Sequence, residues 1–211
     1  MNSAITLHLG RRYESAELHL RLPAAPDKIE EQLTWLDDYA EDLSKPVELR
    51  DVSCEIVGIR QYLRQADLSR EGELERLNAL AEKITGMDWR QRDLLWGALD
   101  SESVGSLDDV LRVADSLEQY ELLGDIRCDR DLGAHLVETG YMEFPSYVLP
   151  YLDYAAIGLE YRAEHGGSFN GGGYVRKKDM DRQMAAGESC EPWAFQILPR
   201  PISTASRTTL V

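Results

Sequence analysis

Carboxylates are the side chains through which the middle of this chain could act on a partner. Between Glu71 and Glu143 the sequence has 18 Asp and Glu against 7 Lys and Arg, a local net charge of −11 in a chain that totals −15. Asp108, Asp115 and Glu118 would share one face of a helix, where neighbours three or four residues apart lie roughly 5–6 Å from each other. Phosphates along one DNA strand advance by about 3.4 Å along the axis and lie somewhat further apart through space, so the two spacings are comparable. Such a row could stand in for DNA in a protein groove.

The acidic row is expected to continue across the loop that follows this helix. The predicted partner-binding surface consists of Asp108, Asp109, Asp115, Glu118, Glu121, Asp125, Asp129 and Asp131. The excess of negative charge is local, and few cations within the segment are expected to neutralise it. A concentrated charge of one sign bears on partners and solubility rather than on fold. The alternative, an acidic helix face that is merely solvated, stays open.

Two histidines raise the question of a metal site. His8 and His19 fall on the polar face of two facing strands, with no Cys or carboxylate expected at ligand spacing around them. A bare pair of this kind favours a cross-strand contact at the surface over a metal site. We therefore expect no metal.

Two further chemistries are disfavoured by missing motifs. Asp129, Asp131 and Glu138 with His135 could hold a metal for hydrolysis, but no Ser-His-Asp order, nucleophile elbow or His-Glu-x-x-His motif accompanies them. The glycine-rich stretch 168–175 lacks the Lys-Ser/Thr pair and the preceding apolar strand of a phosphate-binding loop. We expect no enzymatic activity, no catalytic residue and no cofactor.

The composition is typical of a folded protein that acts away from membranes and nucleic acids. Apolar residues make up 43% of the 211 residues, and the mean hydropathy is −0.39. No run of about eighteen apolar residues is present, and the N-terminus lacks a secretory signal pattern. Cys54, Cys128 and Cys190 form no disulfide framework, which favours the reducing cytoplasm. A pI near 4.7 disfavours binding to nucleic acid, because phosphates would be repelled.

The elements that must position the acidic row predict an α+β fold, which begins with a small antiparallel unit over residues 1–70. Alternating residues predict a hairpin whose buried face carries Ile5, Leu7, Leu9, Leu18, Leu20 and Leu22. A helix opened by Pro26 and ended by Pro46 is expected to bury Ile29, Leu33, Leu36, Ala40 and Leu43. A strand over Val47–Val57 and a short helical piece after Gly58 complete this unit.

Residues 71–143 are predicted to form the acidic central helical unit. Its first helix spans Glu73–Thr85 and is expected to stop at Gly86. The second helix carries Trp89 and Trp96 on one face, two turns apart. Core packing is the expected role of both indoles.

Capping residues mark where the other central helices begin. The predicted starts are a capping box formed by Asp88 and Gln91, a cap formed by Ser106 with Asp109, and a cap at Asp129. The helix that begins at Asp129 is expected to end at Gly140.

A small C-terminal α+β unit is predicted over residues 144–178. Asp153 opens its helix, Gly166 and Gly167 close it, and two short strands surround a glycine turn within 168–175. Aromatic residues are frequent in a unit too small for its own core, which predicts a two-fold interface that includes Tyr151, Tyr154, Tyr161, Phe169 and Tyr174. Residues 179–211 lose periodicity and are expected to form a tail or a lid.

Three sequence boxes resemble ArdA-type antirestriction proteins, particularly forms carried by mobile elements of Gram-positive gut bacteria. The boxes are Leu77–Ile84, Gly105–Leu111 and Tyr151–Gly158, the last leading into Gly166–Phe169 and Gly173–Val175. The likeness covers roughly residues 74–175. None of the boxes is a catalytic signature, so the likeness rests on their order and spacing.

The resemblance implies an elongated, acidic homodimer that mimics bent DNA. Its implied partner is the methyltransferase–specificity complex of a type I restriction-modification enzyme, whose DNA-binding groove it would occupy. This chain departs from related chains at Arg112–Leu117, where a polar run is common, and from about Asp179 onward, where no counterpart is evident. A DNA mimic aimed at another defence nuclease, such as a CRISPR effector with its basic channel, and a non-inhibitory acidic scaffold protein are the alternatives.

Overall fold

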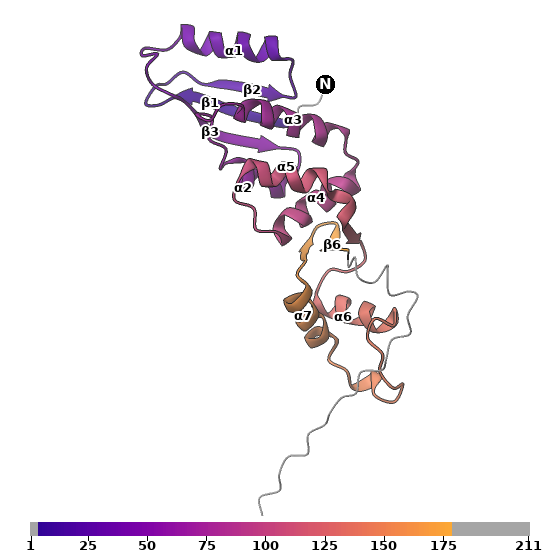
Figure 1. Ribbon diagram of the computed structural model, residues 1–211. Coiled ribbons are helices and arrows are strands. Elements are labelled where there is room, and N and C mark those ends of the chain that lie inside the picture. Colours follow the sequence, from indigo (N-terminus) through magenta and orange to yellow (C-terminus); the bar gives the residue numbers. More distant parts are fainter. Residues whose placement is uncertain (1–3, 179–211) are drawn as a thin grey trace, which may run out of the picture. The chain divides into compact units, whose positions relative to one another are not determined.

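A computed structural model describes residues 4–178, and its helices and strands confirm the predicted α+β class (Figure 1). Within these residues there are two antiparallel sheets of three strands each, together with helices that lie between them in the chain. The predicted tail, residues 179–211, lies outside the described residues. Across residues 4–178, no helix combines the length and the apolar character needed to cross a membrane.

The first sheet forms because apolar residues alternate along two neighbouring strands. Its strands, in the spatial order β2-β1-β3, are β1 (Ile5–Arg11), β2 (Leu18–Leu22) and β3 (Val47–Cys54). Leu7 pairs with Leu20 and His8 with His19, so one face of the hairpin is apolar and the other polar. The predicted hairpin is confirmed, and its six apolar residues are all buried.

The first helix, α1 (Pro26–Asp38), is shorter than predicted. Leu43 lies beyond the helix and is exposed, so its predicted burial is wrong. The reason is Arg11, a buried residue at the end of β1. Its guanidinium donates to the Leu43 carbonyl at 3.1 Å and pairs with Asp37. These bonds hold the chain after the helix as a loop beside the sheet, where helical periodicity no longer applies.

One hydrophobic core continues from this sheet into the central helices. The elements that follow β3 are η1 (Val57–Ile59), α2 (Arg60–Leu63), α3 (Glu73–Gly86), α4 (Trp89–Ser101) and α5 (Leu107–Asp115). α3 contacts both β2 and α5. Buried side chains from Ile5 through Leu122, joined by Val175, form a single cluster. The predicted boundary at residue 70 therefore falls inside a shared core.

α4 places its two tryptophans differently from the prediction. Trp96 is half-buried, and a Cβ added at Gly58 would lie 1.9 Å from the indole Nε1. Trp89 is 72% exposed, so its predicted place in the core is wrong. It is the first residue of α4, whose buried residues begin only at Leu95. Sharing a helix face with a packed residue does not bury a side chain where the helix end extends past the core.

Capping signals give the starts of α4 and α5 correctly. The Asp88 and Ser106 side chains each accept a hydrogen bond from the N–H three residues later. At the next helix the N-cap is Cys128, so Asp129, the predicted cap, is the first helical residue. Gly86 is the last residue of α3 rather than its stop.

A second sheet combines the central and C-terminal parts of the chain. Its strands, in the spatial order β4-β6-β5, are β4 (Tyr120–Leu123), β5 (Ser168–Asn170) and β6 (Gly173–Lys177). The predicted glycine-turn hairpin is the β5–β6 pair. The sequence predicts a loop where β4 lies, because four residues are too few to reveal an alternating pattern. Gly97 of α4 lets Val175 approach so closely that a Cβ at Gly97 would lie 2.3 Å from it.

A second, smaller core joins α6 and α7. The elements here are α6 (Asp129–Glu138), η3 (Leu149–Tyr151) and α7 (Tyr154–His165). The two helices cross at facing glycines, because a Cβ at Gly133 or at Gly158 would lie 1.9 Å from a carbonyl oxygen of the other helix. The buried residues of this core are Ile126, Leu132, Leu136, Tyr161 and Tyr174. The predicted boundary near residue 143 therefore separates helices that pack together.

Candidate acidic binding surface

Helices α3 and α5 carry the first part of the predicted acidic row. Asp108 and Asp115 are two turns apart on α5, about 10.5 Å along the helix axis, and their side chains are 66% and 59% exposed. Each faces a cation of α3: Asp108 pairs with Arg76 at 3.2 Å, and Asp115 pairs with Lys83. Because the two cations are also two turns apart, the pairs form two rungs between the helices. We call this arrangement the α3–α5 ladder.

The ladder does not neutralise this part of the surface. Arg76 also pairs with the buried Glu73 at 3.2 Å, so one cation serves two carboxylates. Glu75 and Glu82 are exposed residues of α3, again two turns apart. Within residues 4–178 neither forms an ion pair with Lys or Arg, although Glu82 accepts a hydrogen bond from Asn78. Negative charge therefore exceeds positive charge on these two helices.

Asp109 serves the fold of α5. Its carboxylate accepts hydrogen bonds from the Arg112 guanidinium at 3.0 Å, the Ser106 hydroxyl at 2.8 Å and the Gly105 N–H at 3.2 Å. The bond from Arg112, followed by those from Ser106 and Gly105, lowers the pKa of Asp109 to about 2. This residue closes the helix N-terminus, and its oxygens are already occupied.

Glu118 and Glu121 lie elsewhere than predicted. α5 ends at Asp115, and Glu118 is an exposed residue of the turn η2 (Leu117–Gln119), so it does not extend the face of α5. Glu121 lies on β4 opposite Arg176 of β6 and pairs with it. An ion pair between opposite residues of neighbouring strands is a stabilising contact of the sheet. Glu121 therefore supports the second sheet rather than a row across a loop.

The last three predicted carboxylates surround the start of α6. Asp129 accepts two hydrogen bonds from Arg162 of α7, at 2.9 and 3.2 Å, and so links the two helices. Asp131 accepts a bond from the Arg127 N–H at 3.1 Å, and this bond lowers its pKa. Asp125 is exposed. It forms no ion pair within residues 4–178.

Five of the eight predicted carboxylates thus have a cationic partner, so the expectation of few neutralising cations is wrong. Arg162 and Arg176 come from beyond residue 143, which a count within the segment cannot reveal. In 71–143, the exposed carboxylates without an ion pair in the described chain are Glu71, Glu75, Glu82, Asp88, Asp100, Glu118, Asp125, Glu138 and Glu143. We call these the open carboxylates.

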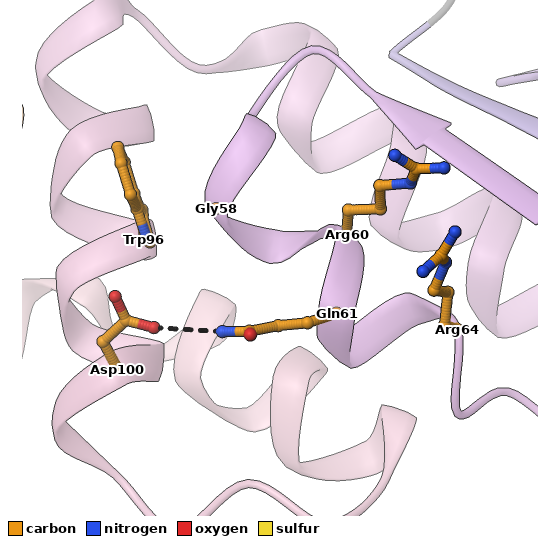
Figure 2. Close-up of a pocket in the computed structure, with 6 residues that line it drawn as sticks. All are labelled: Gly58, Arg60, Gln61, Arg64, Trp96 and Asp100. Atoms are coloured by element: carbon orange, nitrogen blue, oxygen red, sulfur yellow. Dashed lines mark hydrogen bonds between the residues drawn. The ribbon is translucent and has the colours of Figure 1, made fainter.

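A cavity between α2 and α4 is lined by charged groups that already have partners (Figure 2). Its lining residues are Gly58, Arg60, Gln61, Arg64, Trp96 and Asp100. Both guanidiniums bind the Asp51 carboxylate, at 2.6 and 2.9 Å, and hold its pKa well below the usual range. Asp100 accepts bonds from Gln61 and from the Tyr62 hydroxyl. No His, Cys or Ser lines this cavity.

Two of the four residues considered for metal-assisted hydrolysis are engaged in other contacts. Asp129 binds Arg162, and Asp131 binds the backbone. In residues 4–178, the group of His, Cys, Asp or Glu side chains whose ligand atoms converge is instead His8, Glu17 and His19. The expectation that no carboxylate lies near the two histidines is therefore wrong.

The aromatic residues predicted at a two-fold interface divide between interior and surface. Tyr161 and Tyr174 are fully buried within the second core of a single chain, so they are covered without a second copy. Tyr154 and Phe169 are half-buried, and Tyr151 is 86% exposed. The large exposed apolar side chains of this part of the chain are Tyr147, Tyr151 and Leu159.

Comparison with known proteins gives no relative from which to transfer a function. No protein-family model matches the chain, and no curated protein matches it. What the acidic surface binds has to be inferred from its own charges and geometry.

Proposed function

We propose that this chain is a DNA-mimic inhibitor that occupies the DNA-binding groove of a type I restriction-modification enzyme. The observation that carries the proposal is the set of open carboxylates, which stay exposed although other acidic residues of the same segment pair within the fold. Basic protein grooves bind DNA mainly through its phosphates. A rigid surface with an excess of carboxylates offers such a groove an alternative ligand.

The spacing on α3 and α5 supports this proposal. Glu75 and Glu82 on one helix, and Asp108 and Asp115 on the other, are each separated by two turns, about 10.5 Å. Three phosphate steps along one DNA strand cover about 10.2 Å of the axis. Both helices are anchored in the main core, which keeps these intervals fixed. A DNA-binding groove would meet charges near the positions of phosphates.

The resemblance to ArdA-type antirestriction proteins points to the same helices. The box Leu77–Ile84 lies on α3, and the box Gly105–Leu111 includes the cap and the first turns of α5. Two of the three boxes thus fall on the elements that carry the ladder and its flanking carboxylates. The resemblance favours a methyltransferase–specificity complex as the partner and the cytoplasm as the place of action.

A homodimer is part of the proposal. Tyr147, Tyr151 and Leu159 are exposed apolar side chains near or on α7, and burying them against a second copy would remove apolar surface from water. Light scattering at tens of micromolar should report twice the 23.9 kDa chain mass. A monomer at that concentration would reject the dimer. The DNA-mimic proposal would still be tested separately, by competition for DNA.

The direct test is competition for DNA. The chain is titrated into a purified methyltransferase–specificity complex that is bound to labelled DNA carrying its recognition sequence. We expect displacement of the DNA and loss of methylation, with the required concentration rising as DNA is added. DNA that stays bound at a large excess of the chain would reject the proposal. The same titration with a CRISPR effector distinguishes a different target, and inhibition of neither enzyme favours an acidic scaffold.

A further inference from the structure

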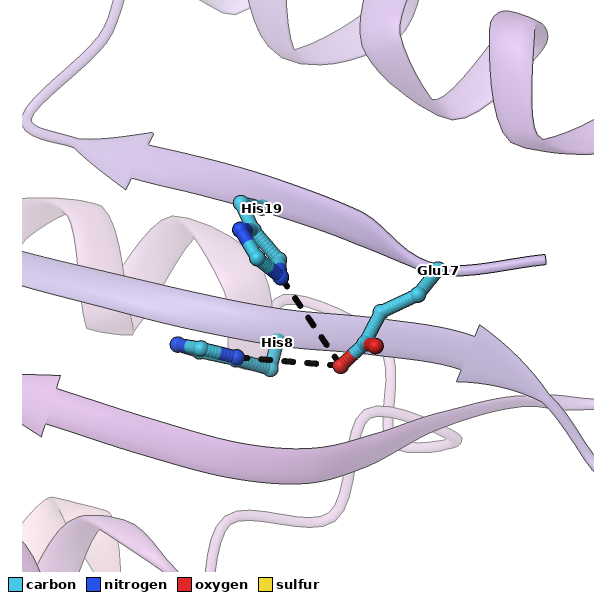
Figure 3. Close-up of side chains that lie close together, drawn as sticks. All are labelled: His8, Glu17 and His19. Atoms are coloured by element: carbon cyan, nitrogen blue, oxygen red, sulfur yellow. Dashed lines mark ion pairs between the residues drawn. The ribbon is translucent and has the colours of Figure 1, made fainter. Parts of the chain in front are cut away.

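Three potential metal ligands meet on the polar face of the first sheet (Figure 3). His8 Nδ1 lies 3.7 Å from Glu17 Oε1, and His19 Nε2 lies 3.8 Å from the same oxygen. The two imidazole rings are 4.3 Å apart between centroids. One ligand atom from each residue lies within 4.8 Å of the other two. None of these residues belongs to the acidic surface or to the central helices.

Strand geometry explains why the three side chains converge. His8 on β1 is paired directly with His19 on β2, so their side chains leave the same face. Glu17 directly precedes β2 and is two residues from His19, which gives it the same side of the chain. From there a glutamate is long enough to reach the diagonal neighbour on β1. The opposite face of the hairpin is packed in the core, so the hairpin cannot slip by one residue without burying this cluster.

The third strand contributes a carboxylate that is already occupied. Asp51 lies opposite His8 in the antiparallel register of β1 and β3, on the side of β1 away from β2. Its oxygens accept hydrogen bonds from Arg60 and Arg64, at 2.6–3.2 Å. Asp51 is therefore held by two guanidiniums. The ligand set consists of three side chains, and its members are half-buried or exposed, so solvent reaches the site.

We propose that His8, Glu17 and His19 bind one divalent transition-metal ion of the zinc type. Zinc takes His nitrogen and carboxylate oxygen at about 2.0–2.2 Å, which puts neighbouring tetrahedral ligands roughly 3.3–3.6 Å apart. The separations of 3.7 and 3.8 Å are within a small side-chain rotation of that value. Two imidazoles favour zinc, nickel or copper over magnesium and calcium, which take oxygen ligands. Three protein ligands leave the fourth position open for water or a ligand.

The bound ion would join the two strands of the hairpin. It would bridge β1 and β2 at the polar face, opposite the buried leucines, and would bind only the folded chain, in which the strands are paired. A ligand that binds the native state alone raises the unfolding temperature in proportion to the logarithm of its concentration. Metal binding is therefore measurable without any assay of inhibition, and it can fail or succeed independently of the DNA-mimic proposal.

The test is a calorimetric titration of the full, tag-free chain with zinc chloride. Because thiolates bind zinc, the background carries Cys128→Ser and Cys190→Ser. We expect one ion per chain and, at a free zinc concentration about a hundred times Kd, a rise in Tm on the order of 5 °C. His8→Ala or His19→Ala should each weaken zinc binding at least about tenfold. Removing even a hydrogen-bond partner of a metal ligand typically costs about 10- to 100-fold in affinity, and these variants remove a ligand itself. Glu17→Gln should also weaken it.

A matched control removes a histidine that lies outside the sheet. His135 is on α6, and His135→Ala should bind zinc as the parent does. Magnesium chloride should give no saturable heat. Melting of each variant without metal establishes that it is folded. Absence of saturable zinc binding by the folded parent, or equal loss in His135→Ala and His8→Ala, would overturn the site.

Discussion

At the scale of single residues, two adjacent aspartates of α5 have different roles. Asp108 is exposed and faces Arg76 of α3 across the ladder, whereas Asp109 turns back to the Ser106 hydroxyl and the Gly105 N–H at the helix start. A carboxylate near a helix N-terminus is stabilised both by unpaired N–H groups and by the helix dipole. Only the first of the two is available to a partner.

The pH dependence of stability should reveal the role of Asp109. Its pKa is lowered to about 2 by Arg112, Ser106 and Gly105, against about 3.9 in an unfolded chain. A depressed pKa gives stabilisation that is present above about pH 4 and is lost as pH falls through about 2. Asp109→Asn should therefore melt below the parent at pH 5, with a difference in Tm that disappears near pH 2.

Glu75→Gln is the matched control for this measurement, because it removes an exposed charge that forms no ion pair within residues 4–178. Its Tm should follow that of the parent throughout the acid range. A difference between parent and Asp109→Asn that stays constant from pH 5 to pH 2 would show that the charge of Asp109 does not contribute.

At the scale of elements, the closest contact in the second core is the crossing of α6 and α7. Gly133 faces the Tyr154 carbonyl, and Gly158 faces the Asp129 carbonyl, so each helix backbone contacts the other directly. The Asp129–Arg162 pair then holds the helices together beside the crossing. A backbone contact cannot be relieved by rotating a side chain.

Gly133→Ala should therefore destabilise the chain. An alanine in a helix is normally favoured over glycine by about 0.5–1 kcal/mol, but overpacking typically costs about 1–3 kcal/mol, and here the obstacle is backbone. We expect a lower urea midpoint by circular dichroism. Gly86→Ala is the control, because a Cβ there meets nothing within 4 Å. It should be neutral or slightly stabilising, and a similar result for Gly133→Ala would contradict the close crossing.

Local patterns predict most of the elements, whereas ion pairs between distant segments escape them. The hairpin of β1 and β2 and the caps at Asp88 and Ser106 depend on residues near one another in sequence, which periodicity and spacing reveal. The partners of Glu121 and Asp129 lie 55 and 33 residues away, on strands and helices whose pairing the sequence does not encode locally. Asp108 and Asp115 likewise pair with cations of another helix, whereas the partner of Asp109, Arg112, is only three residues away.

At the candidate metal site, too, the sequence does not show that the Glu17 side chain reaches a neighbouring strand. Glu17 lies in the alternating run 16–22, two residues from His19 and so on the same polar side of the chain, but alternation does not show how far its side chain reaches toward the neighbouring strand. Only the pairing register, His8 with His19, brings its carboxylate to both imidazoles.

At the scale of the whole molecule, the proposed partner would compete with the fold for the carboxylates of α3 and α5. The ion pairs on α3 and α5 are exposed, and exposed pairs contribute only about 0–1 kcal/mol each. A basic groove can therefore draw these carboxylates away from Arg76 and Lys83 at small cost to the fold. The core beneath the helices, which continues to the first sheet, keeps the surface in place.

Salt should weaken binding to the target strongly. Screening lengths fall from about 10 Å at 0.1 M to about 3 Å at 1 M ionic strength, and the segment 71–143 carries a net charge of −11. We expect the Kd for the methyltransferase–specificity complex to rise steadily over this range. The Tm of the chain, measured at the same salt concentrations, controls for unfolding. A Kd that does not change would exclude an electrostatic mimic.

Replacing exposed carboxylates by amides, singly and in sets, should show how much they contribute to inhibition. Each exposed contact is worth about 0.2–1 kcal/mol, so Asp115→Asn alone should weaken inhibition only a few-fold. Asp108→Asn, Asp115→Asn and Glu118→Gln together should weaken it roughly 3- to 100-fold. This triple variant also leaves Arg76 and Lys83 without their partners on α5, and the freed cations would repel a basic groove.

A second pair of variants distinguishes lost carboxylates from freed cations. Glu75→Gln with Glu82→Gln removes two open carboxylates of α3 and leaves both rungs of the ladder intact. Glu30→Gln with Glu31→Gln removes the same charge from exposed positions of α1 and is the matched control. If α3 and α5 replace phosphates, the α3 variant should weaken inhibition by more than the α1 variant, while both retain the parent's circular dichroism spectrum. Equal effects would mean that net charge alone matters, and one carboxylate whose loss abolishes inhibition would contradict a mimic that acts through many weak contacts.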